Sequence, residues 1–237
     1  MSSKNTPEGR RSPVVDPNFG VTIVTAAEKV DSYDVGLKYF SDRVYATLSV
    51  FASNYTVYQQ SFTDAVTLQS NTITVGDSKM YGVEGTVSYD IDETLNVNVS
   101  LGLLDATFAD TADDGSAFDY AGNNFRLAPE VSGAVSVNKT VSLADWIVDV
   151  NWLTAYQSEV FFESSNYPGL SQPAYWMSDA SIKLSPASNH WSVEVFADNV
   201  FDKEYLIDAG NTGGGLGIPT FVRGTPMIAG LRLYAEM

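Results

Sequence analysis

The strongest constraint in this chain is a two-residue alternation of apolar and polar side chains that persists over unusually long segments. In residues 95–103, leucine or valine occupies each odd position, and asparagine, serine or glycine occupies each even position. The same alternation recurs at residues 83–89, 131–138, 191–198 and 230–234. Successive side chains of a β-strand point to opposite faces. The pattern therefore predicts strands with one apolar and one polar face.

The alternating segments and their neighbours predict nine strands between residues 30 and 236. We expect them at about residues 30–40, 43–60, 78–90, 95–105, 125–138, 144–160, 174–184, 191–205 and 222–236. Most exceed the usual strand length of about five to six residues, and they match the 9–11 residues that a tilted strand needs to cross a bilayer.

The expected connections alternate between short and long along the whole chain. Short turns are expected at residues 41–42, 91–94, 139–143 and 185–189, and long loops at 61–77, 106–124, 161–173 and 206–221. In an antiparallel meander, all short turns then lie on one rim and all long loops on the other. This is the plan of an up-and-down transmembrane β-barrel. Aromatic residues near strand ends are candidates for its interfacial girdles: Tyr39, Phe40, Tyr45, Tyr89, Trp146, Tyr175, Trp176, Trp191 and Tyr234.

Composition excludes several functional classes. The 237 residues contain no cysteine and one histidine, His190, so a disulfide framework, a thiolate metal site and a histidine cluster are excluded. A formal net charge of −16 disfavours a nucleic-acid partner. No apolar stretch reaches the length of a transmembrane helix, and the polar N-terminus has no signal-peptide pattern. We expect no enzyme activity and no cofactor.

Five segments, in order, carry a resemblance to a known family. They are residues 33–38 (YDVGLK), 81–85 (YGVEG), 127–130 (LAPE), 198–205 (DNVFDKEY) and 224–234, which begins GTP and ends LRLY. Together they resemble the C-terminal β-barrel of TonB-dependent outer-membrane receptors. The family's structural motif residues then fall on Asn199, Phe201, Asp202, Tyr205, Gly224 and Pro226. Two departures are Met227, where the family usually has arginine, and the non-aromatic final residue Met237.

The resemblance implies a location and a set of partners. It places the chain in the outer membrane of a Gram-negative bacterium, in contact with lipid and lipopolysaccharide, and it implies assembly by the barrel-assembly machinery. It implies energised uptake of a scarce small-molecule ligand, such as an iron–siderophore complex. Barrels of this family have 22 strands and a plugged lumen. About nine to ten strands are a part of that barrel, and the plug and TonB-contact segment are missing. We therefore expect a fragment that is not transport-competent alone.

The chain divides into a polar N-terminal segment, 1–29, and a barrel part, 30–237. We interpret the first segment as the remnant of an extracellular loop. An odd number of strands cannot close as a purely antiparallel barrel, and residues 20–26 are a candidate tenth strand. Two alternatives remain open at this point. One is a small autonomous outer-membrane barrel, porin-like or structural, and the other is a soluble β carbohydrate-binding module.

The expected long loops combine acidic and aromatic side chains. Within the bounds given above they contain eight acidic residues and no lysine or arginine, which favours a neutral or cationic ligand. Solubility, or divalent-ion bridges to lipopolysaccharide, would explain the same charges. Asp110, Asp113 and Asp114 form a weak calcium candidate whose spacing fails the EF-hand pattern. The candidate ligand-binding aromatics are Phe118, Tyr120, Phe161, Phe162 and Tyr167.

Overall fold

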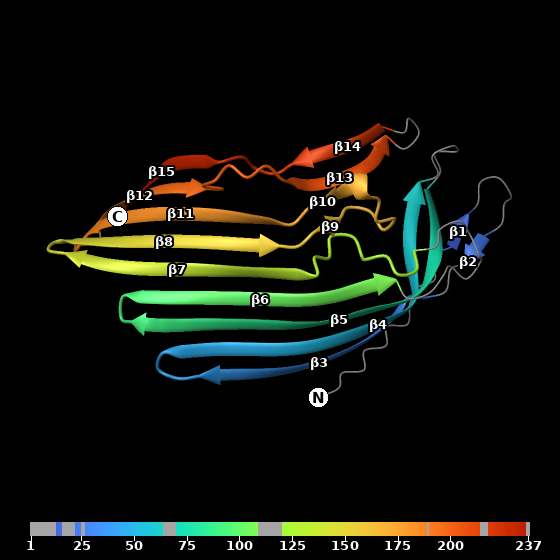
Figure 1. Cartoon of the computed structure of the whole chain (residues 1–237), viewed down its shortest axis with the longest axis horizontal. Helices are drawn as coiled ribbons and strands as arrows, with labels where there is room; N and C mark the ends of the chain where they lie inside the picture. Colours follow the sequence, from blue (N-terminus) through green and yellow to red (C-terminus); the bar gives the residue numbers. More distant parts are fainter. Residues whose placement is uncertain are drawn as a thin grey trace.

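The chain forms one large antiparallel sheet in a computed structural model that describes residues 13–15, 22–24, 27–63, 70–108, 120–188, 190–213 and 218–235. Nine strands lie in the order β15-β12-β11-β8-β7-β6-β5-β4-β3, as Figure 1 shows. This all-β meander confirms the predicted fold class and the expected strand number. Among the described residues, no helix is long and apolar enough to span a membrane.

The strands of the sheet are mostly long. Their bounds are β3 Lys29–Phe40, β4 Val44–Thr63, β5 Ser70–Asp92, β6 Leu95–Phe108, β7 Val131–Leu143, β8 Trp146–Gln157, β11 Tyr175–Pro186, β12 Trp191–Asp198 and β15 Ile228–Ala235. The remaining elements are β1 Pro13–Val15, β2 Thr22–Val24, β9 Val160–Phe161, the 3₁₀ turn η1 Pro168–Leu170, β10 Ser171–Gln172, β13 Leu206–Gly213 and β14 Ile218–Arg223.

The two ends of the sheet differ as the sequence predicts. Short turns join β3–β4, β5–β6, β7–β8 and β11–β12 at the left of Figure 1, and the long connections gather at the right. Among the described strands, β3 and β15 each have one unpaired edge. Because nine strands alternate in direction, these two edge strands run the same way. The described sheet is therefore an open wall.

The pairing register separates two faces of the wall. Val87, Val99 and Val135 lie side by side on one face, and Thr86, Ser100 and Ala134 on the other. The face that carries the valines, here called the apolar face, includes Leu101 and Leu233 with 50% and 79% exposure. A water-soluble protein buries such side chains, whereas lipid solvates them. The buried apolar residues instead gather near the long connections: Ala106, Phe108, Val160, Phe162, Leu170 and Ala209.

Aromatic rings mark both borders of the apolar face. Trp146 and Trp191 meet edge to face at the short-turn end, with centroids 5.7 Å apart. Tyr156 and Trp176 meet at the other end of the same face, with centroids 4.6 Å apart. Ten residues of β8 separate the two pairs, roughly 34 Å along a strand. At a tilt of about 40° this spans roughly 26 Å, which fits the apolar band of an outer-membrane barrel.

The girdle prediction is wrong for part of its list. Tyr39 and Tyr89, like Trp146, Trp176 and Trp191, lie on the apolar face. Phe40, Tyr45, Tyr175 and Tyr234 have the opposite register and lie on the polar face. Proximity to a strand end therefore does not identify a girdle residue, because the face depends on register parity.

Several predicted boundaries are also wrong. β7 begins at Val131 rather than 125 and continues through the expected turn 139–143, and the actual turn is at residues 144–145. Ala144 adopts the left-handed conformation there, with φ 50°. Lys139 and Thr140 looked like turn residues because they are polar. The structure keeps them in the strand by pairing Lys139 with Leu95 and Thr140 with Asp149.

Three expected loops contain strand pairs instead, and the one expected at 161–173 includes the short β9–β10 pair. β4 and β5 remain paired as far as Thr63 and Ser70, so the loop expected at 61–77 is largely a long hairpin. The strand expected at 191–205 ends at Asp198, and the last connection contains the β13–β14 hairpin. Within residues 20–26, Thr22–Val24 forms strand β2, but β2 pairs with β1 and not with the nine-stranded sheet.

Candidate functional site

A small hydrophobic core organises the rim that carries the long connections. Val160, Phe162, Leu170 and Ala209 are buried and form one cluster, against which Leu206 packs. Three of these residues belong to the connection 158–174, and the other two lie in β13. Side chains of two connections thus form one packed unit, which we call the rim core. It lies beyond the wall, on the side of β9, β10 and the β13–β14 hairpin (Figure 1).

The predicted ligand-binding aromatics occupy different environments within this rim. Phe162 is 1% exposed in the rim core, so it has a packing role. Phe161 is half-buried in β9, and Tyr167 is 63% exposed beside η1. Phe118 and the calcium candidates Asp110, Asp113 and Asp114 lie outside the described residues. Phe161 and Tyr167 are therefore open to contact from solvent.

Tyr120 belongs to a second aromatic cluster, at the base of the connection between β6 and β7. Its ring lies 5.7 Å from that of Phe108, which is itself 2% exposed and 4.6 Å from Phe125. Tyr58 stacks on Phe125 at 5.3 Å. Burial, and then the carboxylate of Glu163, raise the pKa of Tyr120 above its usual value. The cluster lies where the β4–β5 pairing shifts register, between Tyr55 and Gln59.

Asparagine side chains join two of the long connections. The Asn166 amide donates to the carbonyl of Asn124 at 2.9 Å, and its Oδ1 accepts from the backbone N–H of Asn124 at 2.6 Å. The Asn123 amide donates to the carbonyl of Ser164 at 2.9 Å. These contacts satisfy loop backbone groups that no strand pairs. These asparagines were not among the residues predicted from the sequence. The only local signal is their type, since asparagine commonly pairs with turn backbone and tolerates the positive φ of Asn166.

The prediction of a rim without basic residues is wrong. Because β7 begins at Val131, Arg126 belongs to a long connection rather than to a strand. Lys203 and Arg223 belong to the connection between β12 and β15, because β12 ends at Asp198 and β15 begins only at Ile228. Glu204 forms an exposed ion pair with Arg223 at 3.9 Å. With these strand ends the four long connections still contain eleven acidic residues against three basic ones. The rim therefore remains acidic, and the preference for a neutral or cationic ligand stays a prediction.

The polar face of the wall carries a hydrogen-bond network. The Asn96 amide donates to Asp90 at 2.7 Å and to Ser88 at 3.1 Å, and the Asn98 amide donates to Asn96 at 2.6 Å. The Asn151 amide donates to Ser181 at 3.2 Å. Such a face suits water or a polar protein segment, and it is the lumen side of the wall.

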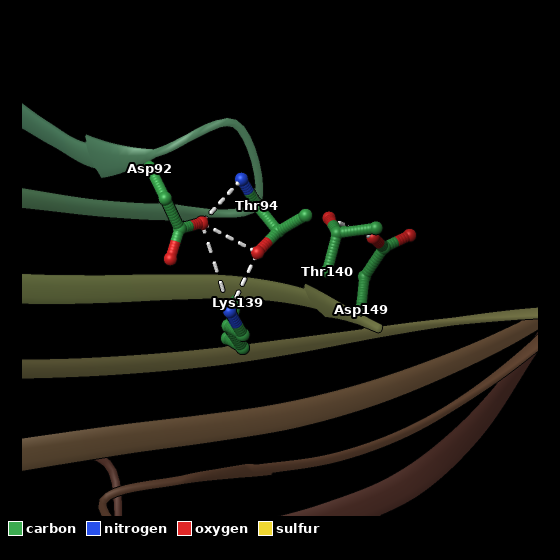
Figure 2. Close-up of polar contacts among 5 residues, drawn as sticks. All are labelled: Asp92, Thr94, Lys139, Thr140 and Asp149. Carbon is green, nitrogen blue, oxygen red and sulfur yellow. Dashed lines mark hydrogen bonds and ion pairs between the residues drawn. The ribbon is translucent and has the colours of Figure 1, made fainter. Parts of the chain in front are cut away.

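Polar contacts also tie neighbouring hairpins together near the short-turn rim (Figure 2). The Thr94 hydroxyl and N–H both donate to one oxygen of Asp92, at 2.6 and 2.7 Å. The Lys139 ammonium donates to the Thr94 hydroxyl at 2.5 Å and lies 3.7 Å from Asp92. Lys139 starts from the apolar face, so the lysine reaches sideways to a polar turn. His190 is exposed at the same rim, next to Trp191 of the girdle.

The motif residues at the end of β12 make a compact turn. Asn199 is 3% exposed and bonds Lys203 and Thr225, and Asp202 accepts the N–H of Met227. Gly224 donates its N–H to the carbonyl of Tyr205 at 2.8 Å. Phe201 is 71% exposed, 6.1 Å from the ring of Trp152. Pro226 lines a surface cavity of about 490 Å³ with Tyr205.

A long antiparallel meander with a lipid-suited face, aromatic borders and a polar opposite face is the wall of a transmembrane β-barrel. The family model described as "TonB dependent receptor-like, beta-barrel" matches residues 7–200. The chain belongs to the TonB-dependent receptor family, whose members are outer-membrane receptors and transporters.

Solved structures show the same fold. The ferric yersiniabactin uptake receptor FyuA from Yersinia pestis matches 93% of this chain with a TM-score of 0.77 and 18% identity. BauA, the ferric preacinetobactin receptor from Acinetobacter baumannii, matches 95% with a TM-score of 0.68 and 18% identity. The copper transporter OprC matches 93% with a TM-score of 0.68 and 16% identity. This chain covers 32%, 32% and 34% of those chains, about a third of each.

Proposed function

We propose that this chain is the C-terminal part of the barrel of a TonB-dependent receptor that takes up a scarce ligand, such as an iron–siderophore complex. The observation that carries the proposal is the two-faced nine-stranded wall, whose strands from β3 to β12 fall within the family-model match. The relatives named above include receptors for ferric siderophores and a copper transporter. A chelated transition metal is therefore the ligand class that best fits.

The wall needs further strands before it can act as a transporter. An open edge leaves backbone N–H and C=O groups unpaired, which is costly in hydrocarbon. Because β3 and β15 run the same way, only an odd number of additional antiparallel strands closes the barrel. A plug and a TonB-contact segment must also come from outside these residues. By itself the chain is then a scaffold that does not transport.

Transport competence is tested in cells that lack their own ferric-siderophore receptors. One strain makes this chain alone, and a second makes it joined to the upstream barrel and plug of its natural gene. We expect radioactive ferric-siderophore uptake only in the second strain. Uptake by the chain alone, together with heat-modifiable mobility on gels, would contradict the proposal and favour a small autonomous barrel. The family assignment leaves the soluble carbohydrate-binding alternative without support.

Phe161 and Tyr167 are the residues that we propose as ligand contacts, because both rings are accessible on an ordered part of the rim. Aromatic packing contributes about 0.5–1.5 kcal/mol per pair. Replacement of either by alanine should therefore weaken binding about two- to tenfold. Phe40→Ala is the matched control, since Phe40 is 80% exposed but lies at the opposite rim. The probes are ferric catecholate, ferric hydroxamate and ferric phenolate chelates and Cu²⁺, bound to outer membranes that contain the full receptor. Equal effects of all three substitutions would contradict this placement.

A further inference from the structure

We propose that Asn199 is a positioning residue of the rim: it sets the direction of the β13–β14 hairpin, and so closes the rim core around Phe162. This assigns a specific task to a side chain that the wall itself does not need for strand pairing. The inference rests on the proposed function only in so far as the rim binds a ligand, and trypsin cleavage tests it without one.

The side chain of Asn199 makes three hydrogen bonds, all to backbone groups of the chain that follows β12. Oδ1 accepts from the Lys203 N–H at 2.8 Å, and Nδ2 donates to the carbonyls of Lys203 at 3.0 Å and of Thr225 at 3.1 Å. Asn199 has φ 51°, a conformation that asparagine tolerates better than most residues. Alanine at this position would leave three backbone groups without these partners and would strain the turn.

Asp202 completes the turn and ties it to the last strand. It also has a positive φ, 47°, and its N–H donates to the carbonyl of Asn199 at 2.8 Å. Its Oδ1 accepts the N–H of Met227, just before β15, at 2.9 Å. β12 therefore ends at Asp198 and β15 begins at Ile228, and the chain between them leaves the line of the wall.

Tyr205 and Gly224 form the next contact after this turn. Besides the 2.8 Å backbone hydrogen bond, the Tyr205 ring occupies the space in which a side chain on residue 224 would begin. The Tyr205 ring also stacks on Tyr175 of β11, with centroids 5.1 Å apart and planes 21° apart. The segments that lead into β13 and out of β14 thus leave the wall in close contact. The Tyr205 ring, packed against Gly224 and Tyr175, fixes the angle at which they leave it.

The hairpin then reaches the rim core. The Leu206 N–H donates to Oε1 of Gln172 at 2.7 Å, and the Leu206 side chain packs on the cluster that contains Phe162 and Ala209. The connection 158–174, which contains Gln172 and Phe162, also carries Phe161 and Tyr167. A change in the exit angle at Asn199 would move Leu206 and Ala209 away from their partners, while the strand pairs below Asp198 stay in place.

Trypsin supplies a direct test, because Lys203 precedes β13, Arg223 is the last residue of β14, and cleavage requires local opening. The natural full-length chain and its variants are purified from outer membranes in detergent. We expect Asn199→Ala to speed cleavage after Lys203 and Arg223 about tenfold or more, with an unchanged heat-modifiable band. Asn199→Asp keeps the Oδ1 acceptor and loses both Nδ2 donors. Its cleavage rate should therefore lie between those of the unchanged chain and Asn199→Ala.

Asn151→Ala is the matched control, since it removes an asparagine hydrogen bond within the wall and should leave rim cleavage unchanged. Gly224→Ala perturbs the same exit through Tyr205 and should reproduce the effect of Asn199→Ala. Unchanged cleavage in Asn199→Ala would overturn the proposal. So would a variant that fails to assemble, or one in which wall unfolding and rim cleavage change together, because each would assign Asn199 to the wall.

Discussion

Val99 offers the most direct test of the two-faced wall. It lies on the apolar face with 42% exposure, between Val87 and Val135 on the neighbouring strands. The apolar series of β6 runs from Leu95 to Leu103, so Val99 has four residues on either side. At about 3.4 Å per residue, Val99 lies roughly 14 Å along the strand from each end of this apolar series. The position is therefore near the middle of the hydrocarbon.

Val99→Arg should destabilise the folded chain in lipid by about 2–4 kcal/mol, the cost of an arginine at the bilayer midplane. Ser100→Arg is the matched control, because Ser100 has the next position and the opposite face. An arginine there reaches water, so we expect a cost below about 1 kcal/mol. Asn98→Arg should also be better tolerated than Val99→Arg. It additionally loses hydrogen bonds to Asn96 and Ser136, at 2.6 and 3.2 Å, and is a less clean control.

The assay is guanidinium unfolding of the full-length chain in phospholipid vesicles, followed by tryptophan fluorescence. The quantity compared is the free energy of unfolding of each variant relative to the unchanged chain. Equal losses for Val99→Arg and Ser100→Arg would refute the face assignment. A larger loss for Ser100→Arg would mean that the sheet is inverted.

Two further predictions concern packing and pH. Gly82→Ala would place a Cβ 2.5 Å from the Leu103 carbonyl oxygen and 2.7 Å from the Phe51 ring, so unfolding titrations should show a loss of about 1–3 kcal/mol. Gly85→Ala, whose nearest contact is at 3.5 Å, should cost much less, and similar losses would contradict the reasoning. The pKa of Tyr120 is raised in the folded chain, so folding favours the neutral phenol. The resulting stabilisation of the folded state is complete below about pH 10, the ordinary pKa of tyrosine, and is lost as the pH rises through the folded-state pKa. Trypsin cleavage after Arg126 should accelerate in alkali, and Tyr120→Phe should reduce that acceleration; an identical pH profile in both proteins would refute it.

The faces and the order of the strands were predictable from residue types, whereas several boundaries were not. Alternation at residues 95–103 predicted which residues of β6 share a face, because period two is a property of the extended backbone. Lys139 and Thr140 were expected in a turn, because local sequence shows neither the hydrogen bond from Lys139 to Thr94 of the neighbouring hairpin nor the one from Thr140 to Asp149 of β8. The left-handed conformation of Ala144, where the chain actually turns, is not visible in local sequence either. The same limit applies at the rim. Aromatic type alone did not separate Phe162, which is buried in the rim core, from Tyr167, which is exposed.

The sequence by itself determined a two-faced antiparallel meander, its lipid-suited side and its family, because side-chain alternation and short motifs are local properties. Only the tertiary structure decided which residues build the rim. The break at Asn199, the pairing of Asn166 with Asn124 and the hydrophobic contacts of Leu206 join segments that are distant in sequence. The tertiary structure also places Arg126, Lys203 and Arg223 in the long connections rather than in the expected strands. Strand ends depend on pairing partners rather than on composition. Those long-range contacts pack the described parts of the long connections against one another at one end of the wall.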